Sequence, residues 1–214
     1  MACMHALSQT RAVPAFSEAC ERNRGPILEV LTRALASSRS VLEIGSGTGQ
    51  HAVHFAAALP HLSWQPTELS CQLAPLAERI RLEGTPNLRA PIALDVHEHP
   101  WPVAPVDAVF SANTLHIMGW SAVRDFFRGV GETLGRPGVL CVYGPFRYHG
   151  EHTSESNVDF DRWLKARDPA SGVRDFEALD ELACAAGLSL AADHAMPANN
   201  RTLVWQRPSG RRLA

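Results

Sequence analysis

Three glycines at alternating positions, directly after a short aliphatic run, constrain the fold of this chain more than any other feature. Residues 40–44 fit a β-strand, and the turn that follows contains Gly45, Gly47 and Gly49 before a helical pattern over 49–59. Glycines at such a turn let the backbone approach a ligand closely and present amides at the start of a helix. The block therefore predicts a strand, a ligand-facing turn and a helix.

The same alternation of strand and helix continues along the chain. Further strands are predicted at 61–67, 90–94, 106–111, 139–143, 188–192 and 202–205, and helices at 17–35, 71–83, 121–134 and 176–186. This order predicts an α/β fold with a seven-stranded, mostly parallel sheet, helices on both faces and an antiparallel last strand. Ser121 is the predicted N-cap of its helix, and Pro26 is expected to break the first helix or to begin its second piece.

Charge and cysteine usage limit the expected partners. The chain carries 20 Lys+Arg against 22 Asp+Glu, a formal net charge of −2, which gives no basic footprint for nucleic acid. No apolar run approaches the roughly 18 residues of a bilayer span, so neither a nucleic acid nor a membrane partner is expected. The first residues lack a secretory signal pattern, and the five dispersed cysteines favour reduced thiols in the cytoplasm: Cys3, Cys20, Cys71, Cys141 and Cys184.

Metal binding is not expected. Three pairs of histidines have a spacing that a metal could use, namely His51 with His54, His97 with His99, and His149 with His152. None of these pairs lies beside the carboxylates or cysteines of a known zinc signature.

Acidic residues accompany three successive predicted strands. Glu43 lies in the first strand, Glu68 ends the second, and Asp95 follows the third. The carboxyl ends of neighbouring parallel strands share one crevice, where Glu68 suits a pair of ribose hydroxyls. Asp95 suits an adenine amino group, with Val96 packed on the ring. Each acid taken alone also fits an ordinary strand-end or helix-capping residue.

The spacing of the glycines separates two classes of nucleotide site. A dinucleotide fingerprint would carry its third glycine at position 50, which is Gln50 here, so a nicotinamide dehydrogenase is disfavoured. Gly-x-Gly-x-Gly preceded by an acid resembles the first motif of class I S-adenosylmethionine-dependent methyltransferases. That resemblance implies a Rossmann-like fold, S-adenosylmethionine as the cofactor, and Glu43 addressing the ammonium of its methionine. A glycine-rich turn without a ligand is the alternative.

Most of the chain, from residue 19 to residue 205, resembles one branch of these proteins, the family called domain of unknown function 938 or methyltransferase-like 26. The blocks that carry the resemblance are residues 21–28, 46–52, 64–66, 94–96, 143–146, 156–161, 166–169, 174–175 and 196–200. The chain departs from the family at Gly45, at Thr67-Glu68 and at Met118-Gly119-Trp120. The last departure borders the expected acceptor, so the resemblance implies no particular methyl acceptor.

The resemblance and the residue chemistry together give a predicted site. The expected cofactor-binding residues are Arg22, Asn23, Glu43, Gly45, Ser46, Gly47, Gly49, Gln50, Glu68, Leu69, Asp95, Val96, Asn113, Thr114 and Leu115. The acceptor is expected at His116, Trp120, Tyr143 and Phe146, with His116 and Tyr143 as the catalytic residues. His116 suits a base or an orienting donor. A structural histidine, and plain core packing of the two aromatic residues, are the alternatives.

We expect a single domain, because 214 residues without a long linker fit one core. Its predicted parts are an N-terminal helical cap (1–39), a cofactor-binding half (40–143), a polar, strand-free, lid-like insertion (144–175) with a short helix at 160–166, and a C-terminal helix and strand pair (176–214).

The predicted function is transfer of a methyl group from S-adenosylmethionine to an O, N or S atom of a small molecule. The alternative is a non-catalytic S-adenosylmethionine-binding or interaction module. An accessible, partly apolar pocket beside His116, Tyr143 and Phe146 would favour the enzyme, and a filled pocket the module. The sequence leaves a homodimer open.

Overall fold

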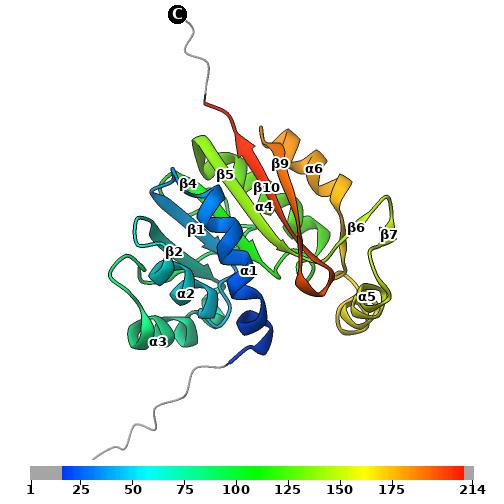
Figure 1. The fold of residues 1–214 in the computed structure, drawn as a ribbon, viewed down its shortest axis with the longest axis horizontal. Helices are drawn as coiled ribbons and strands as arrows, with labels where there is room; N and C mark the ends of the chain where they lie inside the picture. The colour runs from blue at the N-terminus through cyan, green and yellow to red at the C-terminus, as the bar shows by residue number, and fades with distance from the viewer. Residues whose placement is uncertain (1–15, 210–214) are drawn as a thin grey trace, which may run out of the picture.

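A seven-stranded sheet forms the centre of the protein, of which the computed structural model describes residues 16–209 (Figure 1). Its strands are β1 (Ser40–Ile44), β2 (Ser63–Glu68), β3 (Ile92–Ala93), β4 (Val106–Ala112), β5 (Leu134–Gly144), β9 (Ser189–Met196) and β10 (Asn200–Arg207). They run in the order β3-β2-β1-β4-β5-β10-β9. Every pair is parallel except those of β10, which is antiparallel to both β5 and β9. The predicted Rossmann-like fold with an antiparallel last strand is confirmed.

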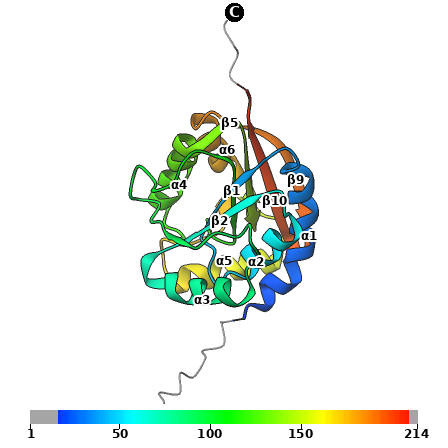
Figure 2. The ribbon, with the colours of Figure 1, turned by 90° about the vertical axis from the view of Figure 1, so that its left-hand side faces the viewer.

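Helices cover both faces of this sheet. They are α1 (Glu18–Ala34), α2 (Gln50–Ala58), α3 (Leu73–Glu83), α4 (Trp120–Thr133), α5 (Glu155–Arg167) and α6 (Phe176–Ala185), with the 3-10 turns η1 (Ser70–Gln72) and η2 (Pro197–Asn199). One buried cluster joins α1 and α2 to the sheet, and a second joins α4 and α6 to its other face. Figures 1 and 2 show these two pairs of helices on opposite sides. The buried sheet therefore fixes the ends of its strands in space.

Two predicted details of the helices are wrong. Helix α1 runs unbroken through Pro26. The proline removes one hydrogen bond, to the carbonyl of the exposed Arg22, which water can satisfy instead. Helix α4 begins at Trp120 with Gly119, not Ser121, at its N-cap, because the amide of Val123 already donates to the Gly119 carbonyl at 3.1 Å.

The predicted strand-free segment 144–175 contains strands, which corrects that expectation. A second sheet of order β7-β6-β8 is formed by β6 (Phe146–Tyr148), β7 (Glu151–His152) and β8 (Arg174–Asp175). Its hairpin turns at His149 and Gly150, both of positive φ (52° and 80°). Strands of two or three residues carry too little alternation to be recognised from sequence. Helix α5 extends beyond the predicted 160–166 at both ends.

The described residues also bear on membrane-spanning helices and on the cysteines. None of their helices combines the length and apolar character needed to cross a bilayer. Cys20, Cys71, Cys141 and Cys184 are free thiols, whereas Cys3 and the first 15 residues of the expected cap lie outside the described range.

Two helical glycines give a stability test of the packing behind the sheet. A Cβ at Gly129 in α4 would lie 2.1 Å from the ring of Trp101, so Gly129→Ala should lower the free energy of unfolding by about 1–3 kcal/mol. A Cβ at Gly25 in α1 would meet nothing within 4 Å outside its chain neighbours, but Pro26 follows it, and a proline ring disfavours a helical Cβ before it. Gly25→Ala should therefore lower the free energy of unfolding by less than Gly129→Ala does. Urea unfolding of both variants measures the difference, and equal effects would contradict this packing.

Candidate functional site

A cavity of about 1020 Å³ opens at the carboxyl ends of β1, β2 and β4. The loops that follow these strands line it, together with the first turn of α1 and the inner side of α5. Ligands of open α/β sheets bind in this crevice, because the loops there diverge from neighbouring strands. The cavity is therefore the candidate site.

The glycine turn after β1 forms one wall. A Cβ at Gly45 would lie 2.8 Å from the side chain of Thr114, so only glycine lets this turn touch the loop after β4. Gly47 has a φ of 53°, and a Cβ there would meet nothing within 4 Å. The backbone at Gly47 is thus bare toward the cavity, which means that no side chain separates it from a ligand there.

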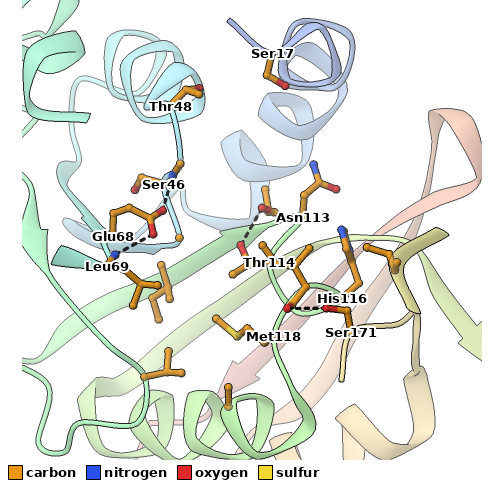
Figure 3. A pocket seen from close by; sticks show the side chains of 18 of the residues that line it. Ser17, Ser46, Thr48, Glu68, Leu69, Asn113, Thr114, His116, Met118 and Ser171 are labelled. Atoms are coloured by element: carbon orange, nitrogen blue, oxygen red, sulfur yellow. Dashed lines mark hydrogen bonds between the residues drawn. The ribbon is translucent and has the colours of Figure 1, made fainter. Parts of the chain in front are cut away.

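Glu68 ties the glycine turn to the end of β2. Its Oε2 accepts a hydrogen bond from the amide of Gly47 at 2.8 Å, and its Oε1 accepts one from the amide of Leu69 at 2.9 Å (Figure 3). The amide of Ser46 also donates to the carbonyl of Thr67 at 2.9 Å. These bonds hold a carboxylate at the cavity wall.

Glu43 lies beneath the turn and does not line the cavity. Its side chain is 2% exposed and accepts a hydrogen bond from the indole nitrogen of Trp64 at 2.9 Å. Burial raises the pKa of this carboxyl to about 7, since a charged carboxylate loses its hydration there. Its predicted role toward the cofactor's ammonium stays a prediction.

The loop after β4 forms the floor of the cavity. Asn113 has a positive φ of 57° and donates its amide to the carbonyl of Tyr143 at 2.9 Å. The hydroxyl of Thr114 donates to the carbonyl of Ala112 at 3.0 Å. These contacts direct the loop across the ends of β4 and β5.

His116 follows on the same loop. Its side chain is 6% exposed and lines the cavity, and burial lowers its pKa to about 4. Neither ring nitrogen has a hydrogen-bond partner among residues 16–209. At neutral pH the ring is therefore uncharged and offers a free lone pair.

Helix α5 supplies the opposite wall through Phe160, Trp163, Leu164 and Arg167. The ring of Phe160 packs edge-on against that of His116, with 5.2 Å between centroids. The amide of Gly172, in the loop after α5, donates to the carbonyl of His116 at 2.8 Å. The insertion is thus joined directly to the loop after β4.

Buried and half-buried polar contacts hold α1 against α2. Gln50 accepts from the amide of Ser17 at 2.5 Å and donates to its carbonyl at 3.3 Å. The side-chain oxygen of Asn23 lies 2.7 Å from Nε2 of His51. Ser17 and His51 line the cavity, whereas Gln50 and Asn23 position them.

The cavity collects about half of the predicted site. Lining residues among those predicted are Gly45, Ser46, Gly47, Glu68, Leu69, Asp95, Val96, Asn113, Thr114 and His116. The predicted residues outside its lining are Arg22, Asn23, Glu43, Gly49, Gln50, Leu115, Trp120, Tyr143 and Phe146.

Several predicted residues outside the lining have other contacts. Arg22 is exposed and pairs with Glu18 at 3.5 Å. Trp120 lies under the guanidinium of Arg174, 5.9 Å from its ring centroid. Tyr143 and Phe146 are buried in the two core clusters, on opposite faces of the sheet.

Sequence reasoning missed part of the lining. The missed residues are Ser17, Ala19, Cys20, Ile44, Thr48, His51, Leu94, His97, Ala112, Ile117, Met118, Ala122, Phe160, Trp163, Leu164, Arg167, Asp168 and Ser171. One sequence pattern could have identified some of them. The spacing of Phe160, Trp163, Leu164 and Arg167 places these four residues on one side of a helix. Within residues 16–209, no cluster of three or more His, Cys, Asp or Glu side chains could hold a metal ion.

Comparison with known proteins gives the family. The model of the family described as "Protein of unknown function (DUF938)" matches residues 14–207. The chain belongs to this family.

Solved structures with the same fold are O-methyltransferases and related proteins. An O-methyltransferase family protein from Burkholderia thailandensis matches with a TM-score of 0.78 and 16% identity, over 90% of this chain and 58% of the other. The O-methyltransferase family 2 protein from Planctomyces limnophilus DSM 3776, solved with apigenin, gives 0.78 and 15%, over 89% and 58%. PigF, solved with SAH, gives 0.72 and 17%, over 85% and 55%. The DUF938 chain spans less than two thirds of each, and the likeness establishes the fold.

The buried Glu43 gives a pH test. Its folded pKa of about 7 exceeds the ordinary 4.5, so the folded protein holds a proton that the unfolded chain releases between these values. The carboxyl therefore stabilises the fold below about pH 4.5, and this contribution is lost as the pH rises through 7.

Glu43→Gln lacks the titrating carboxyl, so it should not lose this stability as the pH rises. Between pH 5 and 7, the slope of the free energy of unfolding against pH should therefore be more positive in the variant than in the wild type, by up to about 1.4 kcal/mol per pH unit. His51 and His116, whose pKa values burial lowers to about 4, act in the opposite direction but are present in both proteins. Denaturant unfolding at several pH values measures the slopes, and identical slopes would refute the assignment.

Proposed function

We propose that this DUF938 protein is a cytoplasmic S-adenosylmethionine-dependent methyltransferase that methylates an O, N or S atom of a small molecule. The observation that carries the proposal is the meeting of the bare Gly47 turn, Glu68 and Asp95 in one cavity. These three features suit the backbone, ribose and adenine parts of one nucleoside ligand.

The residues present fit this cofactor. A carboxylate has about four lone-pair sites, and Glu68 uses two of them on the amides of Gly47 and Leu69. Two sites therefore remain for a pair of ribose hydroxyls. Asp95 accepts from the amide of His97 through Oδ1, which leaves its other oxygen for an amino group.

Apolar side chains beside these acids suit a purine ring. Leu69, Leu94 and Val96 line the cavity, and the amide of Leu94 donates to the carbonyl of Glu68 at 3.0 Å. Leu69 is 44% exposed, a cost that a bound ring would remove. Bound S-adenosylmethionine supplies a methyl group already activated on a sulfonium.

The chain's own task is then mainly alignment. Holding two reactants in line is worth about 7–11 kcal/mol, whereas a general base typically contributes 10²–10⁴-fold, or about 3–5 kcal/mol. The neutral ring of His116 can accept a hydrogen bond from the acceptor's nucleophile and orient it. Its lowered pKa makes it a weak base, so we assign it positioning by this hydrogen bond.

The roles of residues outside the lining are indirect in this proposal. Glu43, Asn23 and Gln50 support the glycine turn and the first turn of α1 from beneath. Tyr143 contributes through packing, in the buried cluster that joins α1 and α2 to the sheet.

The alternative, a module that binds the cofactor without catalysis, predicts a filled acceptor side. The cavity extends past Thr114 to His116, Met118 and Phe160. This space beyond the cofactor residues favours an enzyme.

Gly47 provides a direct test of cofactor binding. Both Gly47 and Gly150 have positive φ and open space at Cβ, so Gly47→Ala and Gly150→Ala carry the same kind of backbone strain. Only Gly47 lines the cavity. Calorimetry should show S-adenosylhomocysteine binding to the wild type and to Gly150→Ala, strong weakening in Gly47→Ala, and no binding of NAD or NADP. Unchanged affinity in Gly47→Ala would sink the assignment.

Glu68 should act on the ribose. Glu68→Ala should weaken binding of S-adenosylmethionine and S-adenosylhomocysteine alike, by about 1.5–3 kcal/mol, because both contain the ribose. Glu98→Ala, an exposed acid outside the lining, is the control and should leave both affinities unchanged. A loss confined to S-adenosylmethionine would show that Glu68 responds to the sulfonium charge.

A further inference from the structure

The cavity has two chemically different ends. Figure 3 shows Glu68 and Leu69 on one side, His116 and Ser171 on the other, and Asn113 and Thr114 between them. Phe160 packs against His116, which places α5 at the second end. We call Phe160, Trp163, Leu164 and Arg167 the α5 wall.

The α5 wall is aromatic and partly open to solvent. The rings of Phe160 and Trp163 stack with 5.8 Å between centroids and 17° between planes. Trp163 is 51% exposed, and Ile117, which lines the cavity nearby, is 55% exposed. Large apolar groups left in solvent at a cavity indicate a surface that a ligand covers.

Arg167 adds to this wall a cation without an ion-pair partner among the described residues. Its guanidinium lies 4.6 Å from the ring centroid of Trp163. Among residues 16–209 no carboxylate pairs with it and no acceptor takes its N–H groups.

Other charged groups near this end already have partners. Arg162 pairs with Asp159 at 2.7 Å, and Lys165 with the buried Asp161 at 2.6 Å. Arg174 donates to backbone carbonyls, including that of Leu115 at 3.1 Å. Asp168, the acid that lines the cavity here, accepts from the amide of Ala170 at 2.9 Å.

We propose that the acceptor is a planar aromatic anion, with its ring against the α5 wall and its carboxylate or phosphate on Arg167. A guanidinium binds such groups through paired N–H bonds while its face rests on an aromatic ring. That this ligand is methylated rests on the proposed function. Its binding does not, since the contacts come from α5.

Binding of model anions tests the inference. NMR titrations, with S-adenosylhomocysteine present, compare 2-naphthoate with the neutral 2-naphthamide, and benzoate with phenyl phosphate. The naphthoate should bind about tenfold or more tightly than the amide, the scale of a charge-assisted pair. Arg167→Gln should remove this preference, and Arg162→Gln, on the same helix but outside the lining, should keep it. Trp163→Leu should weaken both naphthyl probes. A preference for benzoate or for phenyl phosphate identifies which anion Arg167 accepts.

Three results would overturn the inference. The first is equal affinity of the wild type for naphthoate and naphthamide, and the second is an equal effect of Arg167→Gln and Arg162→Gln on that preference. The third is that Arg167→Gln loses affinity for S-adenosylhomocysteine by the same factor as it loses affinity for naphthoate. The last would place the cofactor's own carboxylate on Arg167. If S-adenosylhomocysteine does not bind the wild type, the proposed function fails, and the same titrations without it still decide the role of Arg167.

Discussion

The contact between the glycine turn after β1 and the ends of β2 and β4 is the constraint on which the site depends. Gly45 touches Thr114 where a Cβ would clash, and the amide of Gly47 donates to Glu68. The loops after β1, β2 and β4, which are far apart in sequence, therefore contact one another. Because the strands beneath are buried on both faces, this point cannot move without disturbing the core.

The two halves of the cavity are built differently. Strand ends and their short loops supply Glu68 and Asp95, so the end that suits a nucleoside belongs to the sheet. The other end is made by α5, which reaches the sheet through the contact of Phe160 with His116 and the bond from Gly172. In the proposed function, the strand ends hold the cofactor and α5 contacts the acceptor, so the acceptor side can vary without altering the cofactor side.

Local sequence patterns predicted the main sheet well, because strands such as β1 and the helices between them have aliphatic runs and turn glycines of their own. The failures came where the local signal was short. Strands β7 and β8 have two residues each and exist only because β6 lies between them. The start of α4 at Trp120 depends on a backbone bond to Gly119, which composition does not encode.

The sequence by itself determined the end of the cavity that contains Glu68. The glycine spacing and the nearby acids, combined with the rule that parallel strands end at one edge, place Gly47, Glu68 and Asp95 together. Only the tertiary structure decided the end of the cavity that α5 lines, where the acceptor is proposed to bind. Tyr143 and Phe146 were expected there, yet they lie in opposite cores. Tyr143 is near the end of β5 in the main sheet, whereas Phe146 begins β6 of the second sheet, which the sequence did not predict. The α5 wall reaches His116 across more than 40 residues, and that contact follows from packing, which no local pattern records.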